Sequence, residues 1–208
     1  MSRRYAGRVE APAGPDIVGS ARATAERLLA PAMPQRWRHV RAVGQKAEQI
    51  AAAFSVPDAA TLAAAAWLHD IGYAADLVDT GFHPLDGARW LRSHGADTRV
   101  AALVANHSCA LIEASERGLH RTLADEFPME HSAIADALIY CDLTTGPDGR
   151  SLTVEDRLCE IRARYGAGSV VARFVERAEK DLVSAVRRTQ RRLNARGVPT
   201  VPITRDGR

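Results

Sequence analysis

An alanine-rich apolar run that ends in two adjacent polar residues constrains this chain more than any other feature. The run Leu62–Leu68 reads LAAAAWL, and His69 and Asp70 follow it directly. The run predicts a buried helix, because it holds good helix formers and no charge. A histidine and an aspartate at the buried end of a helix are costly unless another group pairs with them. We therefore expect a specific partner for this pair, and a metal ion fits best.

Apolar residues recur at helical spacing along most of the chain, and no convincing alternating strand pattern is visible. The sequence thus predicts an all-α fold, a single-domain helical bundle. Its 208 residues, 46% of them hydrophobic, suffice for one large domain with a real core. We expect a flexible N-terminal arm over 1–16, the helical domain over 17–196 and a flexible C-terminal tail over 197–208. The segment 109–127 is compatible with a short helix and a flap.

Start and stop signals divide the domain into its helices. The pattern predicts helices over about 17–30, 35–54, from near Pro57 to His69, after Pro84 up to Gly95, and over about 97–108, 129–142, 153–165 and 169–196. The sequence TTGPDG at 144–149 is a clear turn.

The cysteine pattern indicates the cellular compartment in which the protein is expected. Cys109, Cys141 and Cys159 form no Cys-x-x-Cys pair, which favours a reducing, cytoplasmic location over a disulfide framework or a zinc–thiolate site. No apolar run approaches the length of a membrane span, and no signal peptide is visible.

The net charge of +3 suits an anionic ligand. The basic run at 187–192 has no interleaved aromatic residues, so a solvated helix face is favoured there over nucleic-acid binding. The oligomeric state stays open.

Six candidate metal donors lie on or beside apolar helical stripes. They are His39, His69, Asp70, His83, His107 and Asp142. His39 precedes Val43 by four residues, so both face the same way. Helix bundles build metal sites from side chains that converge from facing helices. A single histidine on an apolar face is more typical of a hydrogen-bonded core residue. His83 is also compatible with a turn, and His107 with a helix cap, but the combined set favours metal binding.

The donor types indicate which metals the site accepts. Imidazole nitrogen and carboxylate oxygen suit Fe, Mn, Zn or Ni, and no thiolate is among the six donors. We expect two divalent ions, with Fe or Mn ahead of Zn or Ni. Asp70 is the candidate bridge, because it follows a histidine donor at the same helix end. The remaining donors divide into His39, His69 and Asp142 for one ion and His83 and His107 for the other.

This residue order resembles the HD superfamily of metal-dependent phosphohydrolases. The similarity covers about 37–145, and WLHDIG at 67–72 is its most specific part. HPLDG at 83–87 and NHS at 106–108 look like the extra histidine segments of the two-metal branch. The resemblance implies an all-helical bundle that hydrolyses phosphomonoesters or phosphodiesters, often in nucleotides.

The expected chemistry is hydrolysis of a small phosphorylated substrate, with a nucleotide as the first candidate. Two ions about 4 Å apart would hold a bridging water and lower its pKa, so that a hydroxide attacks phosphorus in line. Asp70 and His69 are the candidate catalytic residues. Basic side chains match phosphate geometry, and those close to the donors in sequence are Arg38, Arg41, Lys46 and Arg89. No general acid is identifiable.

Two other functions stay open at this point. A branch of the same superfamily uses the same six ligands in a mixed-valent di-iron oxygenase. Members of that branch carry a substrate-holding lysine one turn past the fourth histidine, where this chain has Leu111. The other alternative is a non-catalytic, nucleotide-sensing domain, which the retention of all six ligands disfavours.

Overall fold

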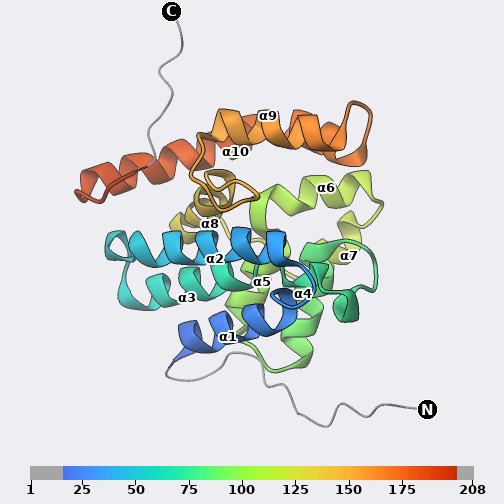
Figure 1. Ribbon diagram of the computed structural model, residues 1–208, viewed down its shortest axis with the longest axis horizontal. Coiled ribbons are helices and arrows are strands. Elements are labelled where there is room, and N and C mark those ends of the chain that lie inside the picture. The colour runs from blue at the N-terminus through green and yellow to red at the C-terminus, as the bar shows by residue number, and fades with distance from the viewer. Residues whose placement is uncertain (1–15, 201–208) are drawn as a thin grey trace, which may run out of the picture.

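Helices form every extended element of the part of the chain that this computed structural model describes, residues 16–200 (Figure 1). They are α1 (Ile17–Leu29), α2 (Pro34–Gln49), α3 (Val56–Leu68), α4 (His83–Ser93), α5 (Thr98–Asn106), α6 (Ala110–Glu116), α7 (His120–Glu126), α8 (Ala133–Leu143), α9 (Val154–Tyr165) and α10 (Val170–Ala195). Short 3₁₀ turns are η1 (Ala51–Ala53), η2 (Ile71–Tyr73), η3 (Ala75–Leu77) and η4 (His107–Cys109). Apart from one isolated bridge, Thr145–Ser151, these residues contain no strand pairing. The predicted all-α, single-domain fold is confirmed.

The alanine-rich helix α3 is the centre of the bundle. It packs against α1, α2, α5 and α8, and Leu62–Leu68 is buried throughout. Trp67 fills the contact with α2, where a Cβ on Gly44 would lie only 2.4 Å from the indole ring. The absence of a side chain at Gly44 therefore lets the indole lie against the α2 backbone. The indole nitrogen of Trp67 donates to Glu48 at 2.6 Å, so this large side chain has a fixed orientation.

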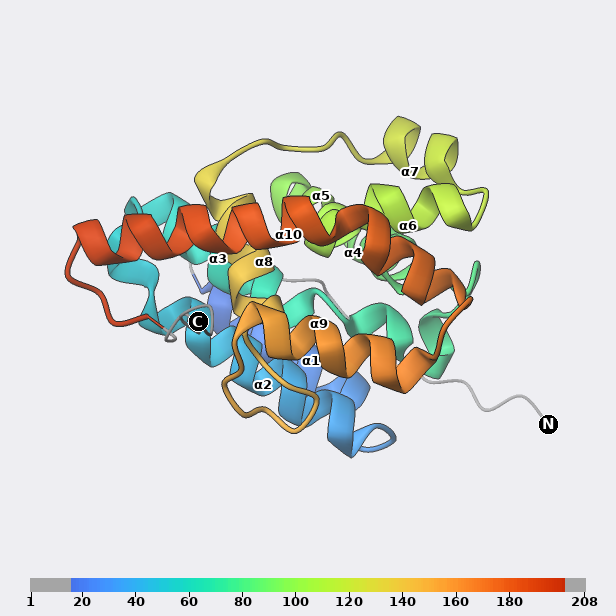
Figure 2. The same ribbon diagram turned by 90° about the horizontal axis from the view of Figure 1, so that it is seen from above.

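The long helix α10 covers the side of the bundle formed by α6, α8 and α9. It packs on α8, α9 and α6, and Figure 2 shows it running across them. Its apolar stripe includes Val175, Leu182, Val186 and Leu193, at the spacing of one helical face. Across residues 16–200, each helix is too short or too polar to cross a bilayer.

Some boundaries differ from those expected. The helix predicted over 35–54 ends at Gln49 and continues as η1. The one predicted from 129 begins at Ala133, because Ser132 caps it by accepting a hydrogen bond from the Ala135 amide. The segment 109–127 contains two helices, α6 and α7.

Most residues of the predicted terminal segments fall outside the described residues. Of the N-terminal arm predicted over 1–16, only Asp16 is described, and its carboxylate caps α1 by accepting from the Gly19 amide at 2.9 Å. Of the tail predicted over 197–208, residues 201–208 are not described.

Candidate metal centre

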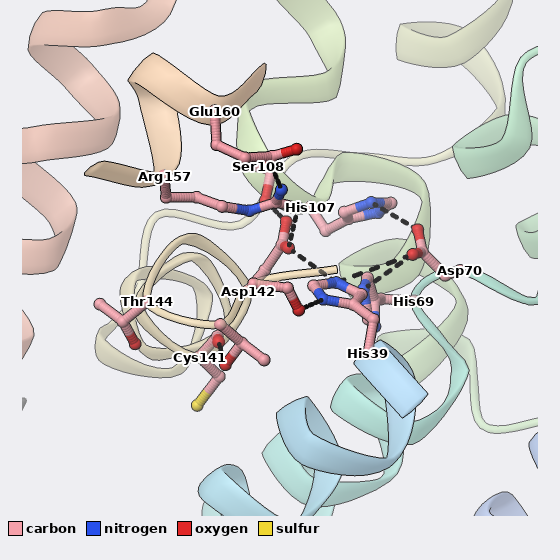
Figure 3. Close-up of polar contacts among 12 residues, drawn as sticks. His39, His69, Asp70, His107, Ser108, Cys141, Asp142, Thr144, Arg157 and Glu160 are labelled. Carbon is pink, nitrogen blue, oxygen red and sulfur yellow. Dashed lines mark hydrogen bonds and ion pairs between the residues drawn. The ribbon is translucent and has the colours of Figure 1, made fainter. Parts of the chain in front are cut away.

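The six predicted donors converge inside the bundle, and four of them are histidines around Asp70. Figure 3 shows five of the six: His39, His69, Asp70, His107 and Asp142. The Oδ1 atom of Asp70 lies 3.2 Å from His83 Nε2 and 3.9 Å from His107 Nε2. Its Oδ2 lies 3.3 Å from His69 Nε2 and 3.9 Å from His39 Nε2. One carboxylate therefore presents a different oxygen to each of two histidine pairs.

The donors form two groups that share Asp70. In each group, one ligand atom per residue lies within 4.8 Å of the others: His39, His69 and Asp70 form the first group, and Asp70, His83 and His107 the second. Asp142 adjoins the first group, with Oδ1 3.2 Å from His39 Nε2. This grouping is compatible with the assignment of the donors to two ions, which stays a prediction.

Each donor is placed by an element boundary or a buried helix face. His39 lies on the inner face of α2, and His69 and Asp70 follow the last residue of α3. His83 begins α4, and its main chain lies directly against η2. A Cβ on Gly72 would be 2.0 Å from the His83 carbonyl oxygen, so only glycine permits this approach. The close contact sets His83 beside Asp70.

Three of the histidines are held through their second ring nitrogen. The Nδ1 contacts are His39 with Gly146 O at 3.0 Å, His69 with Ala66 O at 2.8 Å, and His107 with Val104 O at 2.7 Å. A carbonyl oxygen can only accept, so Nδ1 carries the hydrogen in each ring. In the neutral ring, Nε2 then keeps a free lone pair directed into the centre, the arrangement typical of metal-bound histidines.

Two of the buried donor atoms lack partners of their own. Nε2 of His39 and of His69 is fully buried without a hydrogen-bond partner. With Nδ1 protonated, His39 Nε2 faces the Asp142 carboxylate as one acceptor against another at 3.2 Å. Such a contact is unfavourable unless a cation lies between the two acceptors. Four imidazoles and two carboxylates therefore fit divalent metal ions.

The electrostatic setting favours ionised carboxylates and a neutral His107. Burial opposes ionisation of Asp70, but the Arg36 charge and His69 hold its pKa well below the ordinary value. Burial likewise opposes ionisation of Asp142, but the adjacent His39 and His69 imidazoles and the Arg157 charge hold its pKa below the ordinary value. Burial and the neighbouring histidines lower the pKa of His107 to about 4. The centre thus combines ionised carboxylates with at least one imidazole that is neutral at physiological pH.

A cavity of about 210 Å³ adjoins the donors and is rich in arginine. Its basic lining residues are Arg36, Arg117, Arg157 and Arg164. Arg36 donates to Asp70 Oδ2 at 2.6 Å and lies 4.0 Å over the Tyr73 ring. Arg157 is only 5% exposed, and its Nη2 lies 3.9 Å from Asp142 Oδ1. Each of these arginines also pairs with a carboxylate: Arg36 with Asp70, Arg117 with Glu113, and both Arg157 and Arg164 with Glu160.

The four basic residues chosen from the sequence lie elsewhere. Arg38 and Arg41 are exposed on α2, and neither lines this cavity. Lys46 donates to the main-chain oxygen of Thr144 at 2.6 Å. Arg89 pairs with Glu126 at 2.6 Å and with Asp79. The arginines that contact donors are Arg36, at Asp70, and Arg157, at Asp142. The sequence reasoning missed both, although Arg36 lies one turn before His39.

Sequence reasoning also missed Ser108, which follows a donor directly. Its hydroxyl donates to Asp142 Oδ2 at 2.5 Å (Figure 3). Ser108 and Cys109 both adopt left-handed backbone, with φ of 48° and 60°. Neither residue is a glycine, so the turn after His107 is strained. Leu111, at the lysine position of the oxygenase branch, does not line the metal cavity.

Comparison with known proteins agrees with the geometry. A family model described as "HD domain" matches residues 36–161, a range that contains all six donors. Searches of curated proteins and of solved structures gave no match. The HD superfamily is one of metal-dependent phosphohydrolases, although some of its members are non-catalytic. Since the match covers more than half of the sequence, this chain belongs to the HD-domain family.

Proposed function

We propose that this protein hydrolyses a small phosphomonoester or phosphodiester, with a nucleotide as the first candidate, using two divalent ions. The observation that carries the proposal is the position of Asp70 between two histidine pairs, one on each carboxylate oxygen. One ion would be held by His39, His69 and Asp142, the other by His83 and His107, and both by Asp70. The donor set favours Fe or Mn over ions that prefer thiolate ligands.

Ions bound there would supply an acidified water as nucleophile and neutralise charge on the phosphoryl oxygens. The protein's own residues would orient the reacting groups. Main-chain carbonyls fix three donor imidazoles through Nδ1, so little reorganisation is needed when a ligand enters. Ser108 holds Asp142 from behind, which directs the opposite carboxylate oxygen at His39.

The arginines beside the centre support an anionic substrate. Arg36, Arg157 and Arg164 line the 210 Å³ cavity and also a neighbouring one of about 280 Å³. A phosphate in the first cavity and the rest of the molecule in the second would both contact them. Arg157 has a buried Nε without a partner, and such a donor is costly until an acceptor reaches it. We assign phosphate binding to Arg36 and Arg157, because guanidinium groups match phosphate oxygens in geometry and charge.

The test combines metal analysis with a substrate screen. Protein loaded with Mn or Fe is assayed for phosphate release from nucleoside phosphates, nucleotide diesters and simple phosphomonoesters, with oxygen uptake recorded in parallel. We expect metal-dependent phosphate release by the wild type and a loss of at least about a thousandfold in Asp70→Asn, since both ions lose a ligand. Asp97→Asn is the matched control, because asparagine caps α5 as well as aspartate does.

Two results would contradict the proposal. Phosphate release that is equal in Asp70→Asn and Asp97→Asn would remove Asp70 from the reaction. Oxygen uptake without phosphate release, or tight nucleotide binding without turnover, would replace hydrolysis by one of the two alternative functions.

A further inference from the structure

A second and larger cavity shares His107 with the metal cavity. Its volume is about 1080 Å³, and it lies between α5, α8, α10 and the segment that joins α7 to α8. Figure 2 shows this segment running alongside α10. The lining residues on α10 and at its C-cap extend from Asp181 to Arg196, a span of about 22 Å at 1.5 Å per residue. We call this cavity the α10 groove. Helix α10 lies beyond residue 161, outside the family match.

The groove has an aliphatic floor. Its apolar lining includes Leu103, Leu111, Ile112, Leu138, Ile139 and Ala185. None of its described lining residues is a phenylalanine, tyrosine or tryptophan. The only rings in the described lining are the imidazoles of His107 and His131, whereas an aliphatic chain would bury its surface along the leucine and isoleucine side chains.

Charge is distributed unevenly along the groove. Arg188 is neutralised by Asp136 through two hydrogen bonds of 2.7 and 2.6 Å. Arg191 and Arg196 line the end near the C-terminus of α10, and neither forms an ion pair within residues 16–200. Asp181 lies at the opposite end. An anionic group is thus attracted to one end of the groove and repelled from the other.

Two polar side chains in the lining have unused hydrogen-bonding capacity. Thr189 is 2% exposed, and its hydroxyl has no partner. Asn106 donates its amide hydrogens to Ala102 O at 3.0 Å and Phe127 O at 3.1 Å, which fixes the amide and leaves Oδ1 unpaired. A carbonyl oxygen can only accept. A ligand N–H or O–H group could donate to Asn106 Oδ1. Such a hydrogen bond is favourable because an unpaired buried polar atom costs free energy.

We propose that the α10 groove binds an elongated amphipathic anion with an aliphatic chain. Its acidic group lies at Arg191 and Arg196, its chain covers the leucine and isoleucine floor, and a donor beside the acidic group faces Thr189 or Asn106. Acylated amino acids have this chemistry, since an amide N–H separates a carboxylate from an alkyl chain. The volume of about 1080 Å³ is ample for such a molecule.

The probe is N-dodecanoylglycine, titrated calorimetrically into the full chain below the probe's micelle concentration. We expect one saturable site. The neutral methyl ester of the probe should bind at least about tenfold more weakly, because it lacks the charge that pairs with arginine. Arg191→Gln/Arg196→Gln should lose a similar factor. The matched control is Lys180→Gln/Arg187→Gln, which removes two exposed cations from the same helix outside the groove and should bind as the wild type does.

A second variant tests the cavity itself. Ala135 is partly buried and lines the groove, so Ala135→Leu should fill space and weaken binding without emptying the core. The proposal is overturned if the wild type shows no saturable binding, if acid and ester bind equally, or if both arginine pairs behave alike. Because the readout is binding, its outcome is independent of whether the metal centre hydrolyses phosphate esters.

Discussion

At the residue scale, the metal centre depends on contacts behind the donor atoms as much as on the donors. Ser108 illustrates this, because its hydroxyl donates to Asp142 Oδ2 while the other oxygen faces His39. Loss of such an orienting partner typically lowers metal affinity by about 10–100-fold. Ser108→Ala should therefore weaken binding of one ion by that factor, as measured by titration with Mn²⁺. Cys109→Ala is the control, since Cys109 shares the left-handed turn. Equal affinity in both variants would contradict the orienting role.

Lys46 offers a test of burial through pH. Burial lowers its pKa from 10.5 to about 8, although Asp142 opposes the shift. Between these two values the unfolded chain binds a proton that the folded chain does not, so this residue makes stability rise with pH. Below pH 8, Lys46 is charged in both states and the cost of burying the charge is present in full.

The variant Lys46→Met should remove this contribution. Thr144 O keeps a hydrogen bond from the Leu152 amide at 3.0 Å, so no acceptor is stranded. Urea denaturation at pH 7.5, 9 and 10.5 gives the free energy of unfolding for both proteins. The gap between wild type and variant should shift in favour of the wild type as pH rises. A gap that does not change with pH would show that Lys46 is solvated.

At the element scale, the junction between η2 and α4 determines where His83 lies. A Cβ on Gly72 would be 2.0 Å from His83 O and 2.7 Å from Gly87 N, and both neighbours are main chain. Gly72→Ala should therefore lower the free energy of unfolding by about 3 kcal/mol and weaken the ion held by His83.

Gly95→Ala is the comparison for this junction. Gly95 has a φ of +78° and open space around it, so its substitution should cost only about 1 kcal/mol of backbone strain. Denaturant midpoints measure both losses. If Gly72→Ala costs no more than Gly95→Ala, the close approach of the two elements does not constrain the site.

The arrangement of the helices explains which features of the site could be predicted from the sequence. The donors could be found because His39 and Asp142 share helical stripes with apolar residues, and the stripe fixes the buried face. The contact of Ser108 with Asp142 could not be predicted, because it depends on a left-handed turn that contains no glycine. The α10 groove could not, because its walls come from residues as distant as 102 and 196. The start of α8 was misplaced by four residues because the extended segment before Ser132 carries no breaker beyond Pro128.

For the whole molecule, the centre connects elements that are far apart in the sequence. Its donors come from α2, the end of α3, the start of α4, η4 and α8, across residues 39 to 142. Two carboxylates are buried there, and Arg36 and Arg157 offset part of their charge. Bound ions would therefore stabilise the folded chain selectively, because the unfolded chain cannot assemble these donors.

Metal binding should consequently raise the midpoint of thermal unfolding. At an ion concentration of 100 Kd, one site contributes about 2.7 kcal/mol, which corresponds to about 5–10 °C for a chain of this size. Scanning calorimetry of EDTA-treated protein, with and without added Mn²⁺, measures the shift. The Asp70→Asn variant should lose most of this shift, because it lacks the carboxylate that both groups share. The Asp97→Asn variant should keep the shift. An equal shift in the two variants would mean that the ion binds elsewhere. If Mn²⁺ does not change the unfolding midpoint of the wild type, the converging side chains are held by Arg36 and hydrogen bonds alone.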